Sequence, residues 1–139
     1  NAIFTGGLQP HYYCLPVLKR EIHREALIQA ATSGSSRFFM GTDSAPHART
    51  LKEQSSGCAG CYSGLHALEL YAQAFEMVGK IDCLEGFTSF HGPDFYGLPR
   101  NTETVTLRRQ TYTVPSALPF VNGGSLVPLA AGTELNWTF

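Results

Sequence analysis

The sequence has 139 residues, of which 43% are hydrophobic and 15% are charged. This length fits one domain with a real core, and the charged share is below the usual quarter, which indicates that part of the surface is normally covered. The net charge is −1, with no block of like charge and no apolar run of about 18 residues, so we expect no nucleic-acid partner and no membrane span. The four cysteines and the absence of a signal peptide at the start predict a cytoplasmic chain with reduced thiols.

The first predicted elements follow the order helix, short loop, strand. Apolar residues recur at every fourth position early in the chain, which predicts an amphipathic helix from Val17 to Gly34. The positions that share this face are Leu18, Ile22, Ala26 and Ala30. The apolar run from Arg37 to Thr42 then predicts a short buried strand. This order is typical of an α/β protein.

The second half contains fewer regular elements than a complete α/β domain needs. A long polar loop is followed by a predicted helix from Leu65 to Val78, and one or two short helices are expected between 81 and 99. The face of the long helix is predicted to consist of Leu68, Tyr71, Ala72, Phe75 and Val78. Alternation at Val105 and Leu107 predicts an edge strand over 102–114, and short strands are expected in the tail. Because a complete (β/α)₈ barrel needs about 250 residues, we interpret the chain as the last part of a larger α/β fold.

Ionisable residues cluster directly after the predicted strand at 37–42. Asp43 stands where parallel strands of α/β folds deliver side chains to a ligand crevice, and a carboxylate there binds metal or moves a proton. The alternative is that Asp43 caps the turn. His47 is a candidate ligand for an anionic substrate or a metal, or else a surface histidine. Arg49 is interpreted as a structural or surface charge, with substrate contact as the lesser alternative.

The segment Cys58–Cys61 has the CxxC spacing of redox and zinc sites. A redox motif is usually preceded by a strand, whereas a polar loop precedes this one, and no second CxxC completes a zinc site. The alternative is that Ala59 and Gly60 are small so that their backbone can approach a ligand and offer N–H groups to an anion.

Five motifs together resemble those of one family, bacterial-type dihydroorotase of the amidohydrolase superfamily. They are GGLQPHYYCLPVLKRE, GTDSAPHAR, KEQSSGCAGCYSG, HGPDFYGLP and LVPLAAGTELNW. The resemblance covers nearly the whole chain, in order, and corresponds to the C-terminal part of the family. It implies the last strands and helices of a (β/α)₈ barrel, with residues 1–100 as the C-terminal barrel segment and 101–139 as a tail.

The resemblance also implies a site. The family interconverts N-carbamoyl-L-aspartate and L-dihydroorotate in pyrimidine biosynthesis at a centre of two zinc ions. Asp43 matches the aspartate that contacts zinc and carries the proton of the attacking hydroxide. His47 matches a histidine that holds the substrate carboxylate, and Ala59, Gly60 and Leu15 match backbone contacts to the substrate. Cys58 and Cys61 match no zinc ligand of the family.

The sequence lacks most of the groups that this chemistry requires. No His-x-His is present, and the family's carboxylated lysine, other zinc histidines, and substrate arginine and asparagine have no counterpart. One aspartate does not hold two zinc ions. We therefore expect the 139-residue chain alone to be inactive, to bind no catalytic zinc and to self-associate through exposed strand edges and an apolar face. The alternatives are a zinc or thiol module built on Cys58 and Cys61, and a non-catalytic self-associating domain.

Overall fold

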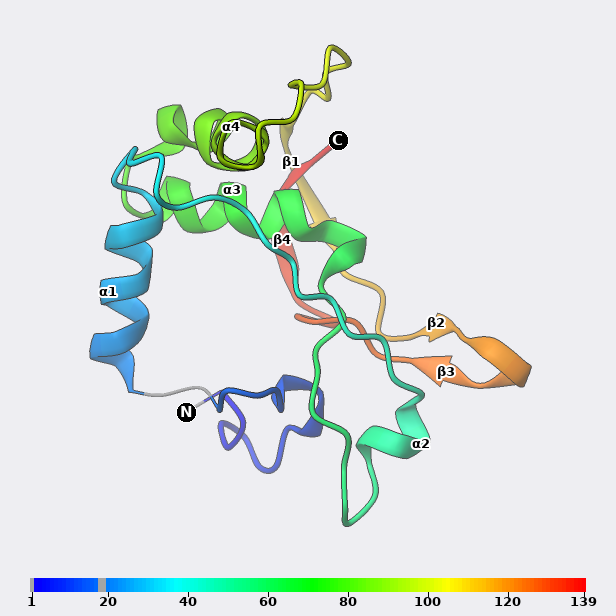
Figure 1. The fold of residues 1–139 in the computed structure, drawn as a ribbon. Coiled ribbons are helices and arrows are strands. Elements are labelled where there is room, and N and C mark those ends of the chain that lie inside the picture. The colour runs from blue at the N-terminus through cyan, green and yellow to red at the C-terminus, as the bar shows by residue number, and fades with distance from the viewer. Residues whose placement is uncertain (1, 18–19) are drawn as a thin grey trace. The chain divides into compact units, whose positions relative to one another are not determined.

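The computed structural model describes residues 2–17 and 20–139, which divide into two compact units (Figure 1). Unit 1 consists of Asn1–Glu21, Thr42–Leu65 and Thr113–Glu134. Unit 2 consists of Ile22–Gly41, His66–Tyr112 and Leu135–Phe139. Each unit is therefore assembled from three separate stretches of the sequence. The predicted division at residue 100 stays a prediction.

The described residues form short helices and two small sheets. The α-helices are α1 (Glu21–Ala31), α2 (Arg49–Lys52), α3 (Ala67–Met77) and α4 (His91–Tyr96), with a π-helical turn at Gly86–Phe90 before α4. Short 3₁₀ turns lie at Pro10–Tyr12, Gly64–His66, Ile81–Cys83 and Val121–Gly123. The strands are β1 (Arg108–Thr113), β2 (Leu118–Pro119), β3 (Ser125–Leu126) and β4 (Glu134–Thr138). Strand β1 pairs with β4, and β2 pairs antiparallel with β3. In the described residues no helix is long and apolar enough to cross a membrane.

The core of unit 2 lies on one face of α3, as the sequence predicts. Phe75 is 1% exposed and packs with Ala72, Leu84 and Phe87. The rings of Phe75 and Phe87 are 5.2 Å apart between centroids, a favourable tilted arrangement. The helix ends before Gly79, whose φ of +67° is the left-handed conformation that glycine adopts at low cost. The long predicted helix is thus confirmed, although Val78 at its end is exposed.

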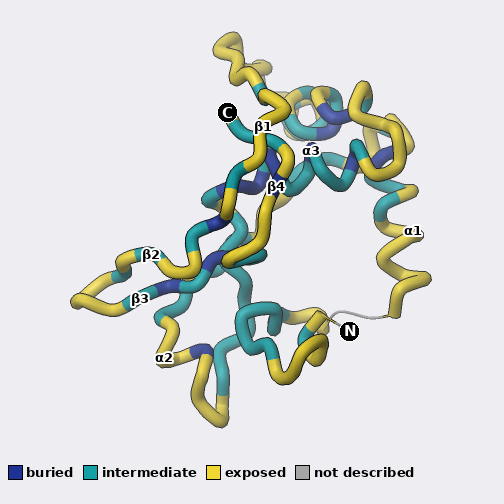
Figure 2. Tube along the Cα trace, turned by 180° about the vertical axis from the view of Figure 1, so that it is seen from behind, coloured by how far each residue is buried: buried dark blue, intermediate teal, exposed yellow. Residues whose placement is uncertain are grey.

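Helix α1 also forms, and its apolar face is open. The predicted helix begins earlier, but its Leu18 lies outside the described residues. On the predicted face Ile22 is 64% exposed, Ala26 is also exposed and Ala30 is half-buried, so the face that the sequence marks as apolar contacts little protein (Figure 2). This exposure matches the expectation that the chain alone leaves an apolar face uncovered.

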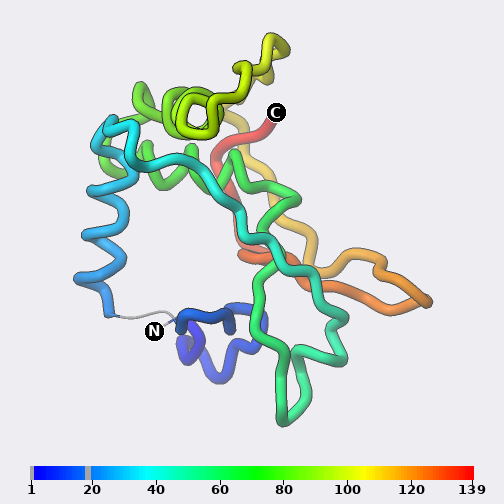
Figure 3. Tube along the Cα trace, in the orientation of Figure 1, coloured from blue at the N-terminus to red at the C-terminus, as the bar shows by residue number. Residues whose placement is uncertain are grey.

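The predicted strand at 37–42 is wrong as a paired strand. This segment runs after α1 without pairing in either sheet (Figure 3). Its backbone is bound by helical neighbours instead: the Met40 N–H donates to the Phe87 carbonyl at 2.9 Å, and the Gly41 carbonyl accepts from the Tyr71 hydroxyl at 2.9 Å. A strand needs a neighbouring strand, and neither two-stranded sheet supplies one here.

The predicted edge strand at 102–114 is correct only in its second half. Strand β1 begins at Arg108, so Val105 and Leu107 precede it. The partner strand β4 has 5 residues, and ladder pairing cannot extend beyond them. The short strands expected in the tail are confirmed by β2, β3 and β4.

Candidate functional site

Asp43 lies in unit 1 with a strained backbone conformation, and its neighbours Thr42 and Ser44 are held by hydrogen bonds. Its φ of 43° is in the left-handed region, which is uncommon for a residue with a Cβ atom. The Ser44 hydroxyl accepts hydrogen bonds from the Ser63 and Gly64 N–H groups at 3.2 and 2.9 Å, and the Ser63 hydroxyl donates to the Thr42 carbonyl at 2.9 Å. Within the described residues the Asp43 carboxylate is exposed and has no hydrogen-bond partner. A turn-capping role is therefore not supported, and the carboxylate is available to a ligand.

His47 lies against the backbone of Ala59 and Gly60, which the sequence places 12 residues further along. Its Nε2 is 3.1 Å from the Ala59 carbonyl oxygen, so Nε2 carries the proton and donates it. Nδ1 has no partner in the described residues and remains available. A Cβ atom on Gly60 would lie 2.9 Å from His47 Nε2 and 2.6 Å from Ala45 Cβ, and the φ of Gly60 is +136°. Gly60 is thus required for the close approach.

The Leu15 segment joins the same cluster through the backbone. The Gly60 N–H donates to the Tyr13 carbonyl at 2.9 Å, two residues before Leu15. The Leu15 side chain is 67% exposed. The Gly60 N–H is used in this bond, whereas the Ala59 N–H has no acceptor in the described residues. The structure thus brings His47, Ala59 and Gly60 into contact and ties the Leu15 segment to them.

A buried lysine that the sequence did not single out holds this cluster together. Lys52, the last residue of α2, is 4% exposed, and its ammonium donates to the carbonyls of Tyr13, Cys58 and Gly60. The three Nζ–O distances are 2.9, 2.8 and 2.6 Å. Burial lowers the pKa of Lys52, because removal from water disfavours the charged form. A lysine in a polar loop looks like a surface charge, so no sequence signal marked it.

The geometry does not support the thiol and zinc hypotheses for Cys58 and Cys61. Burial raises the pKa of the Cys61 thiol to about 11, with the neighbouring Cys14 adding to the effect. A redox cysteine needs the opposite shift, because the thiolate is the reactive form. All four cysteines are free, and no group of three or more potential metal ligands occurs among the residues that the structure describes.

Arg49 forms an ion pair at the surface. Its Nε is 2.8 Å from Glu53 Oε1, and His11 Nε2 is 2.9 Å from the same oxygen. The hydrogen bond from His11, followed by that from Arg49, lowers the pKa of Glu53. This arrangement supports the structural interpretation of Arg49.

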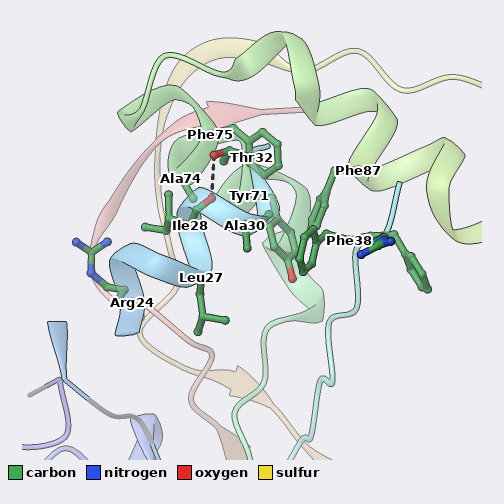
Figure 4. A pocket seen from close by; sticks show the side chains of 13 residues that line it. Arg24, Leu27, Ile28, Ala30, Thr32, Phe38, Tyr71, Ala74, Phe75 and Phe87 are labelled. Atoms are coloured by element: carbon green, nitrogen blue, oxygen red, sulfur yellow. Dashed lines mark hydrogen bonds between the residues drawn. The ribbon is translucent and has the colours of Figure 1, made fainter. Parts of the chain in front are cut away.

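Unit 2 contains an apolar groove of about 470 Å³ that includes none of the predicted site residues. Side chains of α1 and α3 face the same space, and the Thr32 hydroxyl turns away to the Ile28 carbonyl at 2.8 Å (Figure 4). The lining is Arg24, Leu27, Ile28, Ala30, Ala31, Thr32, Arg37, Phe38, Phe39, Tyr71, Ala74, Phe75 and Phe87. With few polar groups, the groove is suited to protein contact rather than to catalysis.

In comparisons with known proteins, nearly the whole chain matches proteins of one kind. No protein-family model matches. The chain is 67% identical over 137 residues to dihydroorotases of Acaryochloris marina and Cupriavidus metallidurans, covering 99% of this chain and 39% and 40% of those proteins. It is 65% identical to the Picosynechococcus enzyme over 139 residues. The chain thus spans about two fifths, 39% to 40%, of the length of these curated relatives.

Solved structures give the same result. The dihydroorotase of Saccharomyces cerevisiae in complex with 5-fluoroorotic acid superposes with a TM-score of 0.86 at 34% identity, covering 94% of this chain and 37% of that one. The dihydroorotase of Campylobacter jejuni superposes with a TM-score of 0.82 at 29% identity, covering 99% and 40%. The chain therefore belongs to the dihydroorotase family and corresponds to a C-terminal part of that enzyme.

Proposed function

We propose that this chain supplies one edge of a dihydroorotase active site, which converts L-dihydroorotate and water reversibly to N-carbamoyl-L-aspartate in pyrimidine biosynthesis. The observation that carries the proposal is the contact of His47 with the backbone of Ala59 and Gly60, together with an unpaired carboxylate on Asp43, four residues before His47. The 67% identity to dihydroorotases supports it. The anionic orotate analogue bound by the yeast neighbour fits a substrate of this class.

In the complete enzyme we assign residues 37–42 to the last strand of a (β/α)₈ barrel. The N–H groups of Phe39, Gly41 and Thr42 have no acceptor in the described residues, so this segment retains free donors for a neighbouring strand. Asp43 follows at its carboxyl end, where barrel enzymes place catalytic side chains.

The described residues could supply only one ligand of a two-zinc centre. Asp43 offers one exposed carboxylate, and no group of three potential ligands occurs in the described part of the chain. The family's zinc ions, when bound, make water a nucleophile near neutral pH. Asp43 would take a proton from the attacking water on a carboxylate oxygen. It would then deliver that proton to the ring nitrogen as the amide C–N bond breaks.

His47 and Ala59 are suited to the substrate's carboxylate. With Nε2–H donated to the Ala59 carbonyl, His47 can also donate from Nδ1 when the ring is protonated. The N–H of Ala59, the residue whose carbonyl His47 binds, is a second donor without an acceptor in the described residues. Hydrogen bonds from a charged donor to a carboxylate are among the stronger ones in proteins.

The test is a chimera in which this chain replaces the matching residues of the Acaryochloris marina relative. We expect it to hydrolyse L-dihydroorotate, and Asp43→Asn to reduce kcat by roughly 10²–10⁴-fold, the usual range for a lost acid–base group. Asp82→Asn, at an exposed aspartate of unit 2, is the matched control and should leave kcat unchanged. A folded chimera without activity would contradict the proposal. We expect the 139-residue chain alone to show no turnover.

We also propose that the isolated chain self-associates as a homo-oligomer in the cytoplasm, where its four free thiols would stay reduced. The observation behind this is the apolar groove of unit 2 with Leu27 exposed at its edge. In sedimentation, Leu27→Glu should shift the chain toward monomer, because a charge in an apolar contact is costly. Leu8→Glu, at an exposed leucine of unit 1, is the control. A wild-type monomer at micromolar concentration would contradict this proposal.

A further inference from the structure

We infer that Lys52 is the positioning residue of the substrate-binding edge, an inference that rests on the proposed function. It joins the loop at Cys58–Cys61 to the segment at Tyr13–Leu15, and it thereby fixes the backbone on which His47 lies. Lys52 is not itself a proposed substrate contact, although its ammonium binds the carbonyl of Gly60, which is one. Its effect passes through the carbonyl groups that it holds.

The hydrogen bonds of Lys52 connect two segments that are distant in sequence. Tyr13 is 39 residues before Lys52, whereas Cys58 and Gly60 are 6 and 8 residues after it. An ammonium has three N–H donors and no acceptor, and here each donor has one carbonyl. The Gly60 N–H bond to the Tyr13 carbonyl crosses the same junction at 2.9 Å. Tyr13 and Gly60 are therefore joined twice, directly and through Lys52.

The carbonyls that bind Lys52 flank the proposed contact groups. Cys58 and Gly60 lie on either side of Ala59, whose carbonyl accepts from His47 and whose N–H is unpaired in the described residues. In a trans peptide the C=O and N–H point in opposite directions, so the Cys58 carbonyl that binds the ammonium turns the Ala59 N–H away from Lys52, and the Gly60 N–H bond to Tyr13 turns the Ala59 carbonyl away from Tyr13. The orientation of the His47 ring follows, since Nε2 binds the Ala59 carbonyl at 3.1 Å.

The ammonium is held by backbone dipoles rather than by an acid. In the described residues no carboxylate contacts Lys52 Nζ, and its neighbours are the thiols of Cys14, Cys58 and Cys61 and the Tyr13 ring, whose centroid is 5.7 Å away. A buried cation without an anion is costly unless all of its hydrogen bonds are made. Replacing it leaves the Cys58 and Gly60 carbonyls without a donor, whereas the Tyr13 carbonyl keeps the Gly60 N–H, so the loop should open rather than collapse.

The first experiment uses the 139-residue chain. In hydrogen exchange followed by NMR, we expect Lys52→Met to accelerate exchange of the Gly60 amide by at least about tenfold while the amides of α3 keep their rates. Lys80→Met, at an exposed lysine of unit 2, is the matched control and should leave the exchange rates of the Gly60 amide and of the α3 amides unchanged. An unchanged Gly60 rate in Lys52→Met would overturn the inference.

The second experiment uses the chimera and separates KM from kcat. We expect Lys52→Met to raise KM for L-dihydroorotate by roughly tenfold or more, because contacts that bind the substrate are lost. It should lower kcat at saturation by less than about threefold, because Asp43 stays in place. Equal losses in kcat and kcat/KM, or no change, would overturn the inference. An inactive wild-type chimera would overturn the proposed function, and the exchange experiment would still decide whether Lys52 positions the loop.

A second variant covers the case in which Lys52→Met does not fold. Lys52→Gln removes the charge but keeps two N–H donors. It should give the same changes in exchange and KM, each smaller than those of Lys52→Met. If both variants lose the fold of unit 1, the residue is structural only and the inference is overturned.

Discussion

The two units of the chain are stabilised in different ways. Unit 2 has an aromatic core in which Phe75 and Phe87 pack on α3, and most of its stability should come from buried apolar area. Around the candidate site, unit 1 is held by directional bonds from Lys52 and by the close approach of Gly60 to His47. Changes in unit 2 should therefore reduce stability, whereas changes at the site should mainly alter geometry.

The largest expected effect is in the core of unit 2. Phe75→Ala should lower the free energy of unfolding by about 3–5 kcal/mol, the usual cost of removing a buried phenylalanine. Trp137 is the only tryptophan of the chain and packs against this core, so its fluorescence in a urea titration reports the loss. Phe95→Ala, at an exposed phenylalanine of the same unit, should have much less effect. Equal losses in the free energy of unfolding at Phe75 and Phe95 would show that the core does not supply most of the stability of unit 2.

A smaller effect on stability, with a larger one on geometry, is expected at Gly60. Gly60→Ala should cost about 1–3 kcal/mol for backbone strain and should also displace His47, because the added Cβ would lie 2.9 Å from Nε2. Gly7→Ala separates the two causes: Gly7 also has a positive φ, +113°, but a Cβ there meets nothing within 4 Å. In NMR spectra of the imidazole ring, only Gly60→Ala should shift the His47 signals. A shift of the same size in both variants would contradict the contact.

Local patterns predicted α3, because an apolar face with helical spacing needs only its own helix to be recognised. The buried strand predicted at 37–42 was wrong, since an apolar run does not show that a neighbouring strand is present, and no residue of this segment is buried. The assignment of His47, Ala59 and Gly60 to one substrate came only from the family resemblance, and the contact of His47 with Gly60 was not predicted, as the loop between them carries no periodic pattern. Lys52 was missed because its burial depends on carbonyls from two distant segments, which no local pattern records.

The thiols of unit 1 provide the next test. Burial raises the pKa of Cys61 from 9.0 to about 11, so the folded chain holds the thiol proton more tightly than the unfolded chain. Its contribution to stability is therefore complete below pH 9 and is lost as the pH rises toward 11. At pH 8, alkylation of Cys61 by iodoacetamide should be up to about 100-fold slower in the folded chain than in urea, because the thiolate is the reactive form. Equal rates, measured by peptide mass spectrometry, would contradict the burial.

The smallest effect belongs to an exposed ion pair of unit 2. Arg100 Nε and Nη2 lie 2.9 and 2.6 Å from the two carboxylate oxygens of Asp94, and these hydrogen bonds lower the pKa of Asp94. The folded chain thus binds this proton less tightly than the unfolded chain, so the stabilisation is present above the ordinary pKa of 3.8 and is lost as the pH falls through the lower folded value.

Arg100→Gln should move the pKa of Asp94 back toward its ordinary value, measured by NMR titration of the Asp94 carboxyl group. Arg37→Gln removes the same charge from another exposed arginine of unit 2 and should leave that pKa in place. Urea stability at neutral pH should change little in either variant, because exposed pairs are screened by water. A marked loss of stability in Arg100→Gln alone would mean that directional bonds stabilise unit 2 as well. The two units would then differ only in how much of their stability comes from such bonds.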